Sequence, residues 1–303
     1  MIIESLRSII PSLNTIHEII IVDNDSQDNS ETTLKSHFPS IRFFQMGYNA
    51  GFARANNYGI EQSKGEVLLL LNPDTLSLNN SIEECFNRLV ASSYNAAGVQ
   101  LINVDGSPQI TGNYFILGGL NNLLPLPTIG TVIKFLAKKI NVKSTSLPDS
   151  SNIVDVDWLN GAFIMVKKSI IQYAGMLDTD FFLYSEEIEW CARIRKSGPL
   201  VLYGDLKFVH LQGATANEVF NSSGKGYYNL YDKKGCQILV SNFLRIRKQY
   251  GAIWFVIHLF IYILEVPILM FRYFFGRLSS TNEITKSMAF GFPKNLLKLI
   301  CLA

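Results

Sequence analysis

Short apolar segments alternate with polar loops and helical patterns over the first two thirds of the chain. Three segments, EIIIV at 18–22, IRFFQM at 41–46 and EVLLLL at 66–71, are typical of strands buried in a sheet. Helical patterns are expected near 3–13 and 79–92. This alternation predicts an α/β fold with a doubly wound, mostly parallel sheet flanked by helices.

Polar residues follow each predicted strand directly. Asp23 ends the first segment, Asn49 follows the second, and Asn72 and Asp74 follow the third. The carboxyl ends of parallel strands meet at the edge where open α/β sheets bind ligands. A carboxylate held there by a rigid proline turn suits a hard cation that binds phosphate oxygens. Alternatively, the NPDT sequence only caps the next helix.

Three carboxylates, Glu186, Glu187 and Glu189, occupy one predicted helical turn. Carboxylates crowded in this way raise one another's proton affinity, which is typical of a general base or a cation site. Alternatively, a helix begins at Ser185, the acids favour its N-terminus, and Glu189 pairs with Arg193. The histidine that follows VLYGDLKFV, His210, is by itself as typical of a core as of a site.

Composition narrows the classes of function. The chain has 303 residues, 48% of them hydrophobic, and a formal net charge of +2, which argues against a nucleic-acid partner. Its four cysteines lack CxxC spacing, so we expect reduced thiols in a cytosolic setting and no zinc. Neither GxGxxG nor GxxxxGK[ST] occurs, so dinucleotide redox chemistry and P-loop hydrolysis lack support. No signal peptide is expected at residues 1–10.

Four motifs in order resemble a known family. IIIVDNDSQDNS, NAGFARANNYGI, LLLLNPDT, and WLNGAFIMVKKSII with AGMLDTDFFLYSEEIEWCARIRKSG are similar to glycosyltransferase family 2, and to the bacterial rhamnosyltransferases of O-antigen and capsule assembly. The resemblance implies a GT-A fold. It also implies inverting transfer of a sugar, with dTDP-rhamnose as donor, from a nucleotide-diphosphate sugar to a lipid-linked or surface polysaccharide acceptor.

The resemblance also implies roles for individual residues. Asp74 stands in the family's DxD motif and would hold Mg2+ or Mn2+, and His210 would complete this metal site or contact the diphosphate. Glu187 would be the catalytic base, Glu186 would contact the acceptor, and Arg193 would pair with Glu189 to orient the acidic helix. The implied nucleotide-sugar-binding residues are Asp23, Asn24, Asn49, Gly51, Phe52, Asn56, Asn72 and Asp74.

Three departures from the family pattern stand out. The chain opens on MIIESLRSI, which resembles the helix after the family's first strand, so that strand is expected to be missing. Glutamates replace the family's aspartates at the acid cluster, and Arg54 replaces a small residue and is expected to face solvent. The alternative functions are a catalytically impaired binding or assembly subunit and a nucleotidyltransferase, whose basic glycine-rich N-terminal loop the sequence lacks.

An apolar segment of nineteen residues, 253–271, dominates the C-terminal third. It is interrupted by His258 and Glu265, and it is flanked by basic residues. It is just long enough to span a bilayer and equally fits a helix lying at the interface; a buried core helix is the alternative. We expect peripheral or C-terminally anchored association with the cytoplasmic face of a bacterial inner membrane. Domains are predicted at 1–215, 216–251 and 252–303, with a mobile loop at 221–231 and a second short helix at 295–301.

Overall fold

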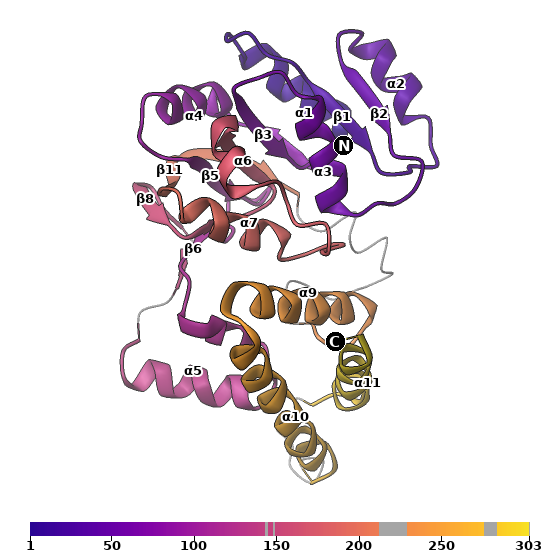
Figure 1. Ribbon diagram of the computed structural model, residues 1–303, viewed down its shortest axis with the longest axis vertical. Helices are drawn as coiled ribbons and strands as arrows, with labels where there is room; N and C mark the ends of the chain where they lie inside the picture. Colours follow the sequence, from indigo (N-terminus) through magenta and orange to yellow (C-terminus); the bar gives the residue numbers. More distant parts are fainter. Residues whose placement is uncertain (143–144, 148, 212–228, 276–283, 303) are drawn as a thin grey trace. The chain divides into compact units, whose positions relative to one another are not determined.

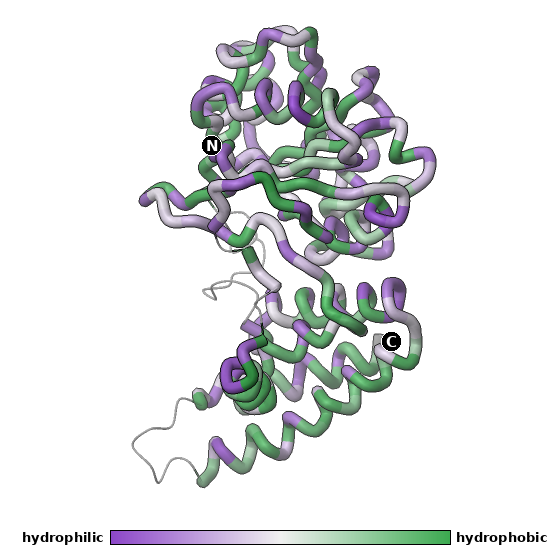
Figure 2. The backbone as a smooth tube through the Cα atoms, turned by 90° about the vertical axis from the view of Figure 1, so that its left-hand side faces the viewer, coloured by the Kyte–Doolittle hydropathy of each residue, from purple (hydrophilic) through white to green (hydrophobic). Residues whose placement is uncertain are grey.

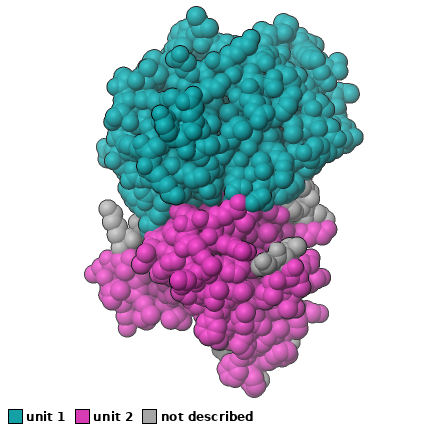
Figure 3. Space-filling model, in the orientation of Figure 1, with its two compact units in different colours: residues 1–115, 145–182, 186–212 teal, residues 116–144, 183–185, 213–303 magenta. Residues whose placement is uncertain are grey.

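The computed structural model describes residues 1–142, 145–147, 149–211, 229–275 and 284–302. The chain forms two compact units (Figure 3). Unit 1 comprises Met1–Phe115, Thr145–Phe182 and Glu186–Gln212, and unit 2 comprises Ile116–Ser144, Leu183–Ser185 and Gly213–Ala303. Unit 2 therefore includes residues 116–144, which the sequence-based boundaries assigned to the first domain, because their apolar side chains share a core with the C-terminal helices.

Unit 1 is built on a six-stranded sheet with the order β3-β10-β5-β11-β4, in which β8 also pairs with β11 (Figure 1). Separate small sheets contain β1 with β2, which are parallel, and β7-β6-β9. The strands are β1 Ile20–Asp23, β2 Arg42–Gln45, β3 Val67–Leu71, β4 Thr75–Ser77, β5 Ala96–Ile102, β6 Gly112–Asn113, β7 Ser146–Leu147, β8 Ile153–Val156, β9 Trp158–Leu159, β10 Phe163–Lys167 and β11 Leu200–His210.

The main sheet is mixed, where the sequence pattern predicted a mostly parallel one. Within it, β11 runs parallel to β5, but β10 is antiparallel to both β3 and β5, and β11 is antiparallel to β4. A strand buried on both faces is apolar throughout in either direction, so its composition does not reveal its direction. Among the described residues, no strand pairs β1 with β3, and the two belong to separate sheets.

Alternate residues of the central strands enter two hydrophobic cores. Leu68 and Leu70 of β3 pack with α3, α6 and α7, whereas Leu69 and Leu71 pack toward α1 and α4. The sheet is thus covered on both faces, as a doubly wound fold requires. The helices of unit 1 are α1 Ile2–Ile9 with η1 Ile10–Ser12, α2 Ser30–His37, α3 Phe52–Gln62, α4 Ser81–Val90, α6 Lys168–Ala174 and α7 Glu186–Arg195.

Unit 2 is helical, with η2 Leu117–Leu123, α5 Ile129–Lys139, α9 Lys233–Tyr250, α10 Ala252–Phe275 and α11 Lys286–Leu302. The apolar segment predicted at 253–271 makes up most of α10, and the helices of unit 2 are coloured mostly as hydrophobic in Figure 2. By length and composition alone, α10 is able to cross a membrane. The short helix predicted at 295–301 belongs to the longer α11, and most of the loop predicted at 221–231 lies outside the described residues.

Candidate active site

The first part of the candidate site is an amide network at the carboxyl ends of β1 and β2. The Asn24 amide donates to the Asn49 side-chain oxygen at 3.0 Å, and the Ala50 backbone N–H donates to the Asn24 side-chain oxygen at 2.7 Å. The Asp23 carboxylate accepts the Ser26 backbone N–H at 3.1 Å and a short hydrogen bond from Gln45. Hydrogen bonds therefore link the two loops that are expected to bind the nucleotide. Ser26 and Gln45 fix the Asp23 carboxylate.

The beginning of α3 is held close to the loop that precedes the acid cluster. The Phe52 N–H donates to the Phe182 carbonyl at 2.9 Å. Gly51 has a φ of +81°, and a Cβ there would clash with the same carbonyl, so only glycine fits. Asn56 donates to the Phe52 carbonyl within the helix at 2.9 Å, and Arg54 is exposed, as predicted.

Asp74 and His210 meet at the end of the sheet. Their side chains are both buried, and the Asp74 Oδ1 atom lies 3.5 Å from the His210 Nε2 atom. The pairing of β4 with β11 sets this position, since Thr75 is opposite His210 and the Leu211 N–H donates to the Asp74 carbonyl at 2.9 Å. The sequence predicted both residues as ligands of one cation, and the fold brings them together from positions 136 residues apart.

The turn at residues 160–162 connects this pair of residues with the acid cluster. The Asn72 N–H donates to the Ala162 carbonyl at 3.1 Å. A Cβ on Gly161 would lie 3.3 Å from Cγ of Glu187 and 3.7 Å from the Phe52 ring, so the backbone and both side chains pack closely. Glu187, Phe52 and the strand end that carries Asp74 therefore line one region of unit 1.

The three acidic residues of α7 differ in their contacts. Glu186 and Glu187 are buried, and each takes part in interactions inside the protein. Two residues in the left-handed region, Tyr184 at φ +73° and Ser185 at φ +70°, come immediately before them. Such strained backbone gathers at functional sites. This strain lowers stability. A helix start that served stability alone would not contain two strained residues.

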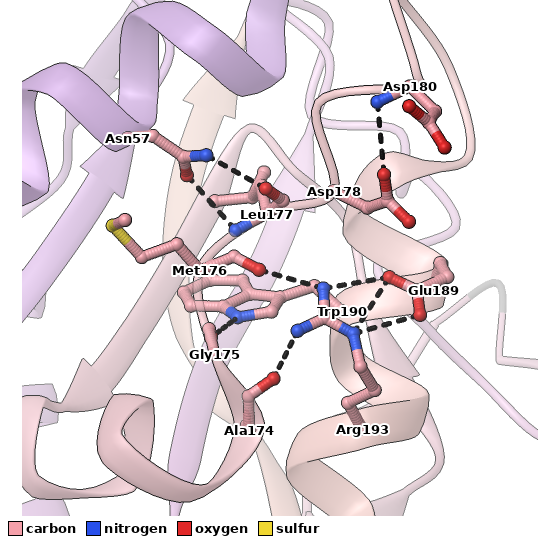
Figure 4. Close-up of polar contacts among 10 residues, drawn as sticks. All are labelled: Asn57, Ala174, Gly175, Met176, Leu177, Asp178, Asp180, Glu189, Trp190 and Arg193. Carbon is pink, nitrogen blue, oxygen red and sulfur yellow. Dashed lines mark hydrogen bonds and ion pairs between the residues drawn. The ribbon is translucent and has the colours of Figure 1, made fainter.

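The predicted ion pair between Glu189 and Arg193 is present, and it stabilises the packing of α7 (Figure 4). The guanidinium group binds the carboxylate through Nε and Nη2 at 2.8 Å, and it also donates to the Ala174 and Met176 carbonyls. The Trp190 indole N–H donates to the Gly175 carbonyl at 2.8 Å. Arg193 and Trp190 thus attach α7 to segment 174–176. These contacts are structural and do not assign either residue a part in the reaction.

Sequence reasoning missed three polar side chains that support the site. Buried Asn57 exchanges two hydrogen bonds with the Leu177 backbone and thereby joins α3 to the acid-bearing segment. Asn160 holds the turn beside Glu187 by accepting the Ala162 N–H at 2.9 Å. Buried Gln109 contacts His210. The only sequence signal for these residues is an amide at a predicted core position, which does not reveal its partner.

The comparisons with known proteins agree with the resemblance that the motifs indicated. Residues 1–138 match the family model described as glycosyl transferase family 2. This stretch is a little under half of the chain and contains Asp23, Asn49 and Asp74, and its match agrees with the family that the motifs resemble.

Curated proteins that the chain resembles are named as glycosyltransferases. The chain is 27% identical to the low-salt glycan biosynthesis hexosyltransferase Agl10 of Haloferax volcanii, over 64% of the chain and 58% of the relative. It is 26% identical to the dTDP-rhamnosyl transferase RfbF of Shigella flexneri, over 64% of the chain and 60% of the relative. The chain thus covers about three fifths of the length of these two relatives.

A solved structure shows the same fold at low sequence identity. The crystal structure of GalNAc-T7 with UDP, GalNAc and Mn2+ superimposes with a TM-score of 0.50 and 14% identity, covering 83% of this chain and 52% of the other. The predicted GT-A fold class, with a helical C-terminal extension, is confirmed.

Proposed function

We propose that this protein is an inverting glycosyltransferase that moves a sugar from a nucleotide-diphosphate sugar to a saccharide acceptor with the help of Mg2+ or Mn2+. The observation that carries the proposal is the buried Asp74 carboxylate facing the His210 imidazole across 3.5 Å, at the end of β3 and β11. The turn at 160–162 joins this pair to Glu187.

The residues present fit a divalent cation. Carboxylate oxygen and imidazole nitrogen are ligands that Mn2+ accepts, and 3.5 Å is about the separation of two ligands on one ion. The described residues contain no group of three or more His, Cys, Asp or Glu at ligand spacing, so diphosphate oxygens and water would complete the shell. When bound, the cation would neutralise charge on the departing diphosphate.

The chain's own residues would then perform the displacement. The acceptor hydroxyl oxygen bonds to the anomeric carbon while the bond from that carbon to the diphosphate oxygen breaks. Glu187 takes the hydroxyl proton as this bond forms. Its burial and its contact with Gly161 fix its position, and Glu186 contacts the acceptor. The amide network of Asn24 and Asn49, with Asp23, lies along the nucleoside.

The finer identity of the substrates rests on the relatives. RfbF of Shigella flexneri is named as a dTDP-rhamnosyl transferase, and a relative from Mycobacterium tuberculosis, 24% identical over 61% of the chain and 63% of its own length, is an N-acetylglucosaminyl-diphospho-decaprenol L-rhamnosyltransferase. These names support dTDP-rhamnose as donor and a lipid-linked saccharide as acceptor. The alternative is a catalytically impaired binding subunit, and the experiment must distinguish it from an active glycosyltransferase.

The test combines binding and transfer. We expect calorimetry to show Mn2+-dependent binding of dTDP or UDP that Asp74→Asn abolishes. We expect Glu187→Gln to keep that binding but to lower sugar transfer at least ~100-fold, because the proton acceptor is lost. Glu61→Gln, on the exposed surface of α3, is the matched control. Full transfer by the Glu187 variant would remove Glu187 as the base, and metal-independent binding would refute the proposed site.

We further propose that unit 2 attaches the enzyme to an anionic membrane surface. Helix α10 has the reverse of a soluble protein's pattern: its buried positions include His258, Tyr262 and Glu265. Its exposed positions are apolar, and they include Ile253, Val256, Phe260, Ile263, Phe271 and Phe274. In water this face is costly, and in lipid it is favourable.

Helix α5 adds to the same kind of surface. Phe135 and Leu136 are more than half exposed, and the exposed Lys134, Lys138 and Lys139 are suited to acidic headgroups. Glu265, near the middle of α10, accepts the N–H groups of Thr128 and Ile129 at the start of α5, at 2.6 and 2.8 Å. A membrane-spanning α10 would draw that helix start into the bilayer, so the bond favours α10 lying in the interface.

Vesicle flotation tests this orientation. We expect the protein to float with vesicles of phosphatidylcholine and phosphatidylglycerol, to float weakly with phosphatidylcholine alone, and to be released by alkaline carbonate. Phe260→Glu should reduce flotation at least ~10-fold, because it places a charge on the lipid-facing side. Val104→Glu makes the same change at an exposed apolar site of unit 1 and should have no effect. Resistance to carbonate would contradict the interfacial orientation.

A further inference from the structure

Gln109 lies behind His210, on the opposite side of the imidazole ring from Asp74. Its side-chain nitrogen donates to the His210 backbone carbonyl at 2.7 Å and to the Asn103 side-chain oxygen at 2.8 Å. Its side-chain oxygen lies 2.9 Å from the His210 Nδ1 atom. Gln109 is 5% exposed, and all these partners belong to unit 1. A single amide thus contacts both the backbone and the ring of the same histidine.

The orientation of this amide follows from its partners. A backbone carbonyl only accepts hydrogen bonds, so the Gln109 nitrogen must face the His210 carbonyl. The Asn103 amide nitrogen donates to the Ser107 hydroxyl at 2.9 Å, which leaves the Asn103 oxygen for Gln109. The Gln109 oxygen therefore faces the His210 Nδ1 atom, and the proton of a neutral ring must lie on that nitrogen.

We infer that Gln109 is a positioning residue that holds neutral His210 in its Nδ1–H form and aims the Nε2 lone pair at the cation site. In this form, Nε2 and the Asp74 Oδ1 atom are both electron donors, and they face each other across 3.5 Å with no proton between them. Such a pair repels until a cation bridges it. The inference rests on the proposed function for the identity of that cation.

The predicted role matches the way metal-binding histidines are usually held. The second ring nitrogen of such a histidine donates to a fixed acceptor, which sets the tautomer and the ring plane, and loss of the acceptor weakens metal binding about 10- to 100-fold. In this protein the acceptor is the uncharged amide oxygen of Gln109. The buried position of both residues excludes the water that would otherwise replace it.

The tautomer is directly measurable because the chain has four histidines, His17, His37, His210 and His258. Long-range proton–nitrogen NMR of histidine-labelled protein, recorded near pH ~8.5 where ordinary imidazoles are neutral, distinguishes the two ring nitrogens. We expect wild-type His210 to be in the Nδ1–H form. Gln109→Met keeps the side-chain length but has no acceptor, so the Nε2–H form should appear.

Binding of Mn2+ with UDP or dTDP provides the second readout. We expect calorimetry to show a loss of about 10- to 100-fold for Gln109→Met. Gln109→Glu keeps an acceptor for Nδ1–H while losing the donor to the backbone, so it should retain the wild-type tautomer and much of the affinity. Asn95→Leu removes another buried amide of unit 1, which donates to the Ser197 hydroxyl at 3.2 Å and has no part in the site, and it controls for loss of stability.

The outcomes separate this inference from the proposed function. A wild-type His210 in the Nε2–H form, or a Gln109→Met variant with unchanged tautomer and unchanged Mn2+ affinity, would overturn the inference. If the wild type shows the Nδ1–H form and Gln109→Met changes it, but neither nucleotide binds with Mn2+, the ring is held as inferred and the proposed function fails.

Discussion

At the scale of single residues, the candidate base is placed by the absence of a side chain. A Cβ on Gly161 would lie 3.3 Å from Cγ of Glu187, which is tighter than most carbon contacts, so Gly161→Ala must displace Glu187 by a few tenths of an ångström. A displacement of about 1 Å costs ~100-fold in rate, and we expect transfer to fall about 3- to 30-fold. Steady-state kinetics checks this, and the change should appear in kcat with binding of Mn2+ and nucleotide unchanged.

Gly65→Ala is a suitable comparison for this variant. Its added Cβ would also lie 3.3 Å from its nearest neighbour, the Val67 carbonyl, at the opposite end of β3 from Asp74. Similar stability and full transfer activity in Gly65→Ala would assign the loss to Glu187. Full activity in Gly161→Ala would show that the turn at 160–162 does not position the base.

At the scale of elements, strand and helix positions were largely predictable, whereas strand directions and helix contacts were not. The apolar segments at 18–22, 41–46 and 66–71 correspond to β1, β2 and β3 within two residues. The neighbours of β10 depend on long-range pairing that leaves no local pattern. Glu265 looked like an interruption of an apolar segment, and its partner at the start of α5 lies 136 residues away in sequence, beyond the reach of periodicity.

That contact predicts a pH dependence of stability. Burial raises the pKa of Glu265, although the N–H groups of Ile129 and Thr128 partly oppose this effect. As pH rises above about 4.3, the unfolded carboxyl ionises first, so the free energy of unfolding decreases until the raised folded pKa is passed. Glu265→Gln lacks this decrease and should gain stability relative to wild type over this range. Urea unfolding at several pH values measures it, and a constant difference between the two proteins would contradict it.

At the scale of the whole molecule, the small net charge conceals a division between the two units. The sequence of unit 2 contains fifteen Lys and Arg against four Asp and Glu, and that of unit 1 contains twelve against twenty-one. The units therefore carry formal charges of +11 and −9, which together give the +2 of the chain. The net charge of the whole sequence argued only against a nucleic-acid partner. The difference in charge between the units becomes visible when the residues are assigned to units by the fold.

This division predicts how membrane binding responds to salt. The acidic unit is repelled by anionic lipid and the basic unit is attracted, each basic residue near the surface contributing about 1 kcal/mol. Screening shortens the range of both effects from about 10 Å at 0.1 M salt to about 3 Å at 1 M. We expect the affinity for phosphatidylglycerol vesicles to fall about 10-fold or more over this range in flotation assays. Residual binding should persist through the apolar face of α10, and it should disappear in Phe260→Glu. Salt-independent binding would show that unit 2 does not recognise the headgroup charge.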